Sequence, residues 1–138
     1  MHDTLPLGGV IMNIEKDFEY GKIITDSISE LAEKVNFIPH KLFTGVSLKL
    51  LVSGSKTNNM LSLHLVRVEP QCCLESHAHP DNLEMHKVIK GDGTVNIGDH
   101  WEEYQAGTVG VIPMGTKHEV TAGKNGLYIL ATFSPALA

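Results

Sequence analysis

The sequence of 138 residues has few cysteines, no cluster of basic residues and no long apolar run. Its 11 basic residues are never adjacent and are outnumbered by 16 acidic ones, so neither nucleic acid nor an anionic membrane is an expected partner. No stretch approaches the roughly 18 apolar residues of a membrane-spanning helix. The N-terminal region also lacks the basic and apolar parts of a signal peptide. We therefore expect a cytoplasmic protein.

Cysteine is confined to one adjacent pair, Cys72 and Cys73. Neighbouring side chains of a strand point to opposite faces and rarely form a disulfide, so both thiols are expected to be reduced. The C-x-x-C spacing of redox and metal sites is absent. Reduced thiols agree with the expected cytoplasmic location.

From residue 46 onward, short apolar segments show the two-residue period of strands, as in the alternation of Val46, Leu48 and Leu50. Turn clusters rich in glycine, asparagine and proline separate these segments. The predicted strands span residues 46–52, 61–68, 73–77, 83–89, 94–97, 101–104, 108–112, 117–121 and 127–132. So many short strands in a chain of one-domain length predict an all-β sandwich or barrel.

Residues 1–45 lack this period and are predicted to be an N-terminal extension of a barrel domain formed by residues 46–138. The extension begins with a stretch, Met1–Phe18, that we expect to be a loose tail. It would cover the barrel wall or a dimer partner, and the sequence favours neither arrangement.

A short helix is predicted within the extension, over Ile28–Asn36. Ser27 and Glu30 have the spacing of a capping box, and the apolar residues that follow recur at helical spacing. Pro39 lies just beyond and would end the helix.

Two short blocks carry the residues suited to metal binding, HAHPDNLEMHKVIKG at residues 77–91 and GTVGVIPMGTKH at residues 107–118. His77 and His79 are one residue apart, so on a strand they would share a face. A carboxylate, Glu84, follows a short turn, and the second block supplies His118. Three neutral imidazoles and one carboxylate suit a divalent Zn, Fe, Mn, Co or Ni ion and leave positions open for substrate or oxygen.

The spacing H-x-H-x4-E-x6-G followed by G-x5-P-x-G-x2-H resembles the paired motifs of the cupin superfamily, in particular its small single-domain metal-binding members. The resemblance covers about residues 46–133. It implies a double-stranded β-helix, or jelly-roll barrel, with one divalent metal held by four residues. The implied metal ligands are His77, His79, Glu84 and His118.

The chain departs from the family pattern at two positions. Gln71 stands where a glycine often precedes the first histidine by six residues, and Ala122 stands where an asparagine often closes the second block. Both positions fall at expected turns or strand ends. They therefore affect the local backbone rather than the ligand set.

Four further residues have a functional and a structural interpretation. His86 shares a strand face with Glu84, so it would act as a general acid or base, fix Glu84, or form a polar cavity wall. His64 fits a core or surface histidine better than a ligand. Arg67 would clamp a substrate carboxylate or, more simply, form a surface salt bridge. Trp101 follows a turn and is better explained by packing than by substrate stacking.

The leading functional hypothesis is a metal-dependent enzyme that acts on a small polar molecule inside the barrel. Family resemblance favours an oxygen-dependent dioxygenase, with a decarboxylase, lyase or isomerase as the other classes, and Glu84 and His86 as the catalytic residues. The alternative is a module that binds or senses a small molecule without turnover. A subunit stabilised by structural metal ranks last, because such sites are usually closed and rich in cysteine. A homodimer is expected, since exposed sheet edges need covering.

Overall fold

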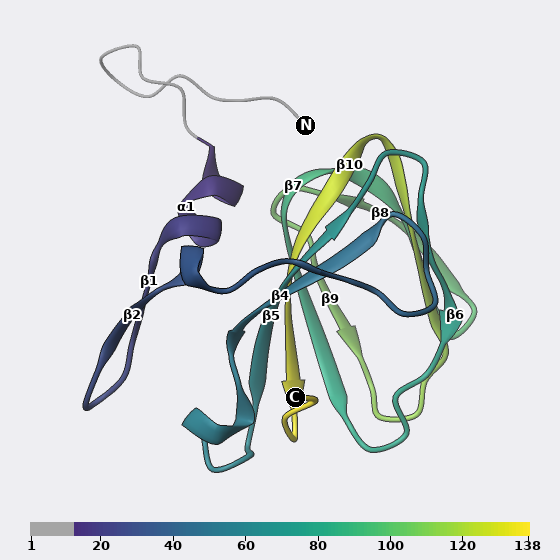
Figure 1. The fold of residues 1–138 in the computed structure, drawn as a ribbon. Coiled ribbons are helices and arrows are strands. Elements are labelled where there is room, and N and C mark those ends of the chain that lie inside the picture. The colour runs from purple at the N-terminus through teal and green to yellow at the C-terminus, as the bar shows by residue number, and fades with distance from the viewer. Residues whose placement is uncertain (1–12) are drawn as a thin grey trace.

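Two long antiparallel strands, β7 (Leu83–Ile97) and β10 (His118–Ser134), organise the fold. The computed structural model describes residues 13–138, and Figure 1 shows the strands wrapped into a barrel with the extension along one side. The main sheet runs β3-β4-β5-β10-β7-β8, with β6 on β10 and β9 on β7. The other strands are β3 (Ile38–Pro39), β4 (Val46–Val52), β5 (Ser62–Val68), β6 (Cys73–His77), β8 (His100–Gln105) and β9 (Val109–Ile112). This arrangement confirms the predicted all-β class.

The bend shared by β7 and β10 was not predicted, since the sequence favoured turns at its glycines. Gly91 pairs with Leu127 and Gly93 pairs with Ala122, so β10 has extra residues opposite the bend. Gly91 has φ +97°, and a Cβ there would lie 1.9 Å from the Gly126 carbonyl oxygen. The glycines therefore bend two continuous strands instead of separating four short ones.

The predicted helix over Ile28–Asn36 is wrong. In its place β2 (Ser29–Leu31) pairs with β1 (Lys22–Ile24), and a 3₁₀ turn follows at Ala32–Lys34. The hydroxyl oxygen of Thr25 accepts hydrogen bonds from the backbone N–H groups of Ser27 and Ile28, which closes the hairpin turn. A side-chain-to-backbone bond of this kind competes directly with a helix cap.

A helix nevertheless occurs earlier in the extension, as α1 (Ile14–Tyr20). It occupies the end of the stretch expected to be a loose tail, Met1–Phe18, and residues 1–12 lie outside the described part of the chain. Within residues 13–138, no helix has both the length and the apolar character required to cross a bilayer.

A buried lysine of the barrel holds the extension. Lys49 is only 3% exposed, and its ammonium donates hydrogen bonds to the backbone carbonyls of Glu19 at 2.7 Å and Ala32 at 3.1 Å. Lys90 on β7 adds an ion pair with Glu15 of α1 at 2.6 Å. Two lysines of the barrel thus find their partners in the extension. These contacts fix the extension against the barrel.

Strand β5 lies between two apolar clusters, which explains why almost all of it is buried. Val66 and Val68 face the barrel interior, together with Val95 and Ile129. On the opposite face, Leu65 packs with a second cluster that lies toward the extension. The continuous apolar pattern of β5 therefore reflects covering on both faces.

Replacing Lys49 with methionine should loosen the extension. Two buried carbonyls would lose their donor, so the free energy of unfolding should fall by about 1–3 kcal/mol in urea titrations. Hydrogen exchange measured by mass spectrometry should rise over residues 13–34.

The matched control is Lys56→Met. Lys56 pairs with Glu30 at 2.8 Å, but both side chains are partly exposed, so the change should stay below about 1 kcal/mol. Equal losses in the two variants would contradict a specific attachment through Lys49.

Candidate metal centre

Three histidines lie close together where strands β6 and β10 pair. His77 ends β6 and pairs in register with His118, which begins β10, and His79 follows in the next loop. One ring nitrogen from each lies within 4.8 Å of the others. This triad is able to hold a metal ion.

Backbone carbonyls fix two of these rings. His77 donates its Nδ1–H to the carbonyl of Glu75 at 2.6 Å, and His118 donates its Nδ1–H to the carbonyl of Thr116 at 3.0 Å. Since a carbonyl only accepts, Nδ1 carries the proton in both rings. The Nε2 lone pair of each neutral imidazole is then left for a metal.

Glu84 at the start of β7 lies beside the triad. Its Oε1 atom is 3.1 Å from His118 Nε2 and 3.7 Å from His79 Nε2. Both Glu84 Oε1 and His118 Nε2 are buried without a hydrogen bond of acceptable geometry. Two facing lone-pair atoms left unsatisfied are what a bound cation would satisfy, so the residues fit a divalent metal.

Burial and charge act in opposite directions on these groups. Burial lowers the pKa of His77 and of His79, which favours the neutral ligand form. Burial also opposes charge on His118 and Glu84, but their close contact outweighs it, raising the pKa of His118 and lowering that of Glu84. Because a metal binds only the neutral imidazole, the raised pKa of His118 means that a metal competes with protons for its Nε2 atom.

A polar chain extends from Glu84 away from the triad. His86 Nε2 lies 2.5 Å from Glu84 Oε2, and His86 Nδ1 lies 3.0 Å from the hydroxyl of Tyr104. His86 is 3% exposed and Tyr104 is 2% exposed. With Nε2–H donating to the carboxylate, Nδ1 accepts from the tyrosine, so the carboxylate is held in place.

Tyr104 was missed by the sequence reasoning, because it reaches His86 only through the pairing of β8 with β7. Its ring also fits against a strand position without a side chain, since a Cβ on Gly110 would lie 2.0 Å from the hydroxyl. Gly110 within a predicted strand is a weak local signal of this contact.

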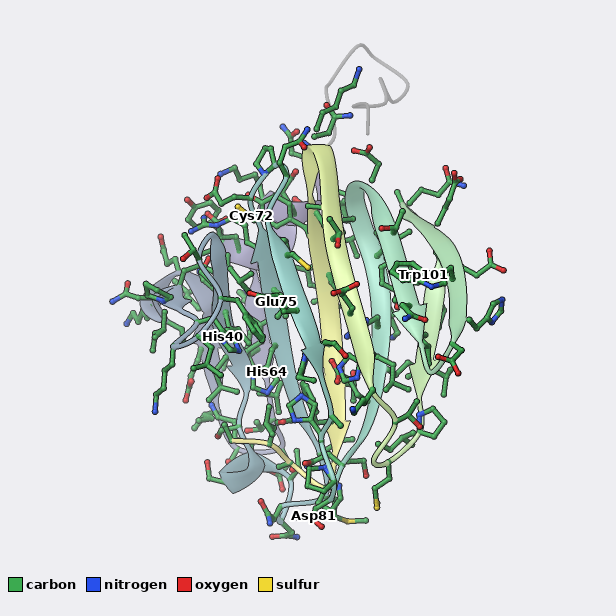
Figure 2. All side chains as sticks on the ribbon, turned by 90° about the vertical axis from the view of Figure 1, so that its right-hand side faces the viewer. His40, His64, Cys72, Glu75, Asp81 and Trp101 are labelled. Carbon is green, nitrogen blue, oxygen red and sulfur yellow. The ribbon has the colours of Figure 1, made fainter. Side chains whose placement is uncertain are left out.

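The remaining candidate residues lie outside the triad. His64 is buried on the inner face of β5, where its Nε2 lies 3.0 Å from the Ser62 hydroxyl. The Arg67 guanidinium lies on the outer face, 4.0 Å above the ring of Phe37. Trp101 is 59% exposed, and Figure 2 shows it on the opposite edge of the barrel from His64, so neither interior packing nor substrate stacking describes it.

Replacing Tyr104 with phenylalanine should weaken metal binding without removing a ligand. His86 would lose its hydroxyl partner and would no longer orient Glu84, which should lower the affinity for Co²⁺ by roughly tenfold or more. Competition titration with a chelating dye measures this.

Tyr128→Phe on the outer face of β10 is the control and should bind Co²⁺ as the unchanged protein does. An unaltered affinity in Tyr104→Phe would show that the polar chain does not support the centre.

The stability of the metal-free protein should depend on pH through His64. Burial lowers the pKa of this imidazole below its ordinary 6.5. Below pH 6.5 the unfolded chain then takes up the proton first, so stability is lost as the pH falls. In His64→Gln, the decline of Tm between pH 7 and pH 5 should be less steep.

His100 is 74% exposed at its side chain, so His100→Gln is a control that should leave the slope unchanged. Thermal scans in a metal chelator give both slopes, and identical slopes in all three proteins would contradict the role of His64.

Comparison with known proteins identifies the fold and its family. The barrel is similar to KdgF from Halomonas sp., with 17% identity, TM-score 0.65, and coverage of 75% of this chain and 88% of that one. A predicted oxalate decarboxylase from Thermotoga maritima has 20% identity and a TM-score of 0.67, and the match covers 73% of this chain and 91% of that one. An RmlC-like cupin from Shewanella frigidimarina has 20% identity and a TM-score of 0.67, and the match covers 84% of this chain and 95% of that one. These likenesses confirm the jelly-roll barrel.

No curated protein matches the sequence. The family model described as Cupin domain matches residues 64–132, which is half of the chain. The matched range contains both motif blocks and all four implied metal ligands. Together with the barrel, this match confirms the resemblance drawn from the motif spacing, and the chain belongs to the cupin family.

Proposed function

We propose that the protein is a metal-dependent enzyme that acts on a small molecule in the barrel cavity. The observation that carries the proposal is the convergence of His77, His79 and His118 with the unsatisfied carboxylate oxygen of Glu84. These four residues would hold one divalent transition metal, with Fe, Mn, Ni, Co and Zn all compatible with the ligand types. Bound there, the metal would supply Lewis-acid polarisation of a substrate oxygen or a site for O₂.

An open centre supports catalysis rather than a structural role. The histidines and Glu84 line a cavity that also has His86 on its wall. The two thiols, Cys72 and Cys73, lie elsewhere, whereas structural zinc sites usually consist of four protein ligands rich in cysteine. A site with protein ligands on one side and a cavity on the other is suited to binding a reactant.

Glu84 and His86 are the proposed catalytic pair. Glu84 is a carboxylate, because its contacts lower its pKa, and its second oxygen receives the His86 N–H. His86 supplies the proton of this hydrogen bond, while its other nitrogen accepts from the Tyr104 hydroxyl. Glu84 would thus exchange a proton with the reacting molecule, and the His86 N–H would stabilise the carboxylate whenever that proton is returned.

The reaction class is an oxygenase by family resemblance, or a decarboxylase, lyase or isomerase. One similar structure, the predicted oxalate decarboxylase from Thermotoga maritima, is described as a decarboxylase, but at 20% identity it supports the shared barrel and not the reaction.

Metal content tests the proposal. Protein expressed without added metal and purified without a histidine tag should contain about one transition metal per chain by elemental mass spectrometry. The double variant His77→Ala/His118→Ala should lose it, since two of four ligands are removed, whereas the exposed His100→Ala should keep it.

Ligand exchange then separates an enzyme from a closed site. Azide added to the Co²⁺-loaded protein should change its visible spectrum, because open positions accept an external ligand. Neither native metal nor uptake of any offered ion would refute the proposal. A loaded protein that binds small acids but turns none over, with Fe and Mn tested by oxygen uptake, would instead indicate the binding module.

A further inference from the structure

We infer that the substrate is amphiphilic, with a small metal-binding head and an apolar body that lies in a groove beside the metal centre. This inference rests on the proposed function and names the class of molecule that would use the site. From the sequence a small polar substrate is expected, whereas in this inference only the metal-binding head of the substrate is polar.

The cavity at the metal centre is too small for a substrate of more than a few heavy atoms. Its volume is about 60 Å³, room for on the order of four to six water molecules. Beyond the four metal-binding residues and His86, most of its walls are apolar, including Val66, Ile129 and Phe133. A chelating head would fill this space, so the body of any larger substrate would extend outward.

An adjoining groove offers the missing room. It has a volume of about 560 Å³, within the range of roughly 300–1,000 Å³ typical of small-molecule sites. His40 and Leu48 line both spaces, so the groove adjoins the cavity. Phe133 lies between them, with its ring 5.1 Å from His79 on the metal side and 5.3 Å from His64 on the groove side.

The groove wall contributed by the extension is held in one conformation. His40 Nδ1 accepts hydrogen bonds from the backbone N–H groups of Leu42 at 3.0 Å and Phe43 at 3.3 Å, and its ring stacks on Phe43 at 4.5 Å. Strand β3 next to it pairs with β4. Figure 2 shows His40 and His64 on the same side of the barrel, as expected for two walls of one groove.

The charges of both spaces favour an apolar body. None of the described residues lining the cavity is lysine or arginine. Along the groove, Lys41 is the only lysine, arginine, aspartate or glutamate among the described lining residues, and it is exposed. Burial lowers the pKa of His40 and His64, so both are neutral. A second carboxylate or a phosphate on the substrate would therefore find no buried partner.

A series of alkyl hydroxamates provides the test, because the hydroxamate head chelates metal and the tail length varies. Acetohydroxamate, butyrohydroxamate, hexanohydroxamate and octanohydroxamate are titrated into the Zn²⁺-loaded protein by calorimetry. Affinity should rise by about threefold to fourfold per buried methylene. The monohydroxamate of suberic acid, which has the octano length and a terminal carboxylate, should show little of this gain.

Two exposed groove residues locate the tail. The double variant Ile38→Ser/Leu42→Ser should lose at least tenfold of the octanohydroxamate affinity and bind acetohydroxamate unchanged. Ile24→Ser is the matched control, since Ile24 is 71% exposed and Ile38 is 66% exposed, and both lie in short strands of the extension. This control should keep the full tail gain.

Failure of the inference and failure of the proposed function give different results. Metal and acetohydroxamate binding with no tail gain, or a gain that survives in the groove variant, would overturn the apolar body alone. A groove variant whose mass by light scattering falls by half while the tail gain persists would assign this face to a second copy of the chain and likewise overturn it. Absence of metal and acetohydroxamate binding would refute the proposed function itself.

Discussion

The close approach of Gly91 to the carbonyl of Gly126 is the constraint on which the rest of the barrel depends. A side chain at Gly91 would collide with that carbonyl, so only glycine permits β7 and β10 to bend together. Beyond the bend, one half of β10 pairs with β6 and the other with β5. The same strand thus presents His118 to His77 at one end and supports the apolar interior at the other.

The candidate centre was largely predictable because its residues obey local spacing. The alternation of His77 and His79, and the separation of Glu84 from them by one turn, specify a shared pocket once the strands form. Gln71, at the position of the usual glycine, has φ +67°, a region that glycine tolerates best, so any strain of this departure lies in the local backbone. The three histidines lie close together despite this departure.

What the sequence did not show depends on contacts between distant segments. The helix expected near Ser27 and Glu30 fails because the Thr25 hydroxyl closes a turn and β1 pairs with β2, and strand pairing is not visible in a capping pattern. The glycines of the bend were predicted to form turns, because a glycine bends a continuous strand only when a partner strand lies against it. The contact of Tyr104 with His86 and the apolar groove likewise form only when several strands and the extension pack together.

The attachment of the extension through Lys49 has a consequence for any attempt to isolate a minimal barrel. Both carbonyls that receive its ammonium, those of Glu19 and Ala32, come from the extension, while the lysine itself lies on β4. A chain that began at residue 46 would leave this ammonium without either acceptor and would expose Leu65 and Leu130, which pack with Ala32 of the extension. The boundary predicted from the change of period therefore marks a change of secondary structure, and we expect a chain cut there to be less stable than the full one.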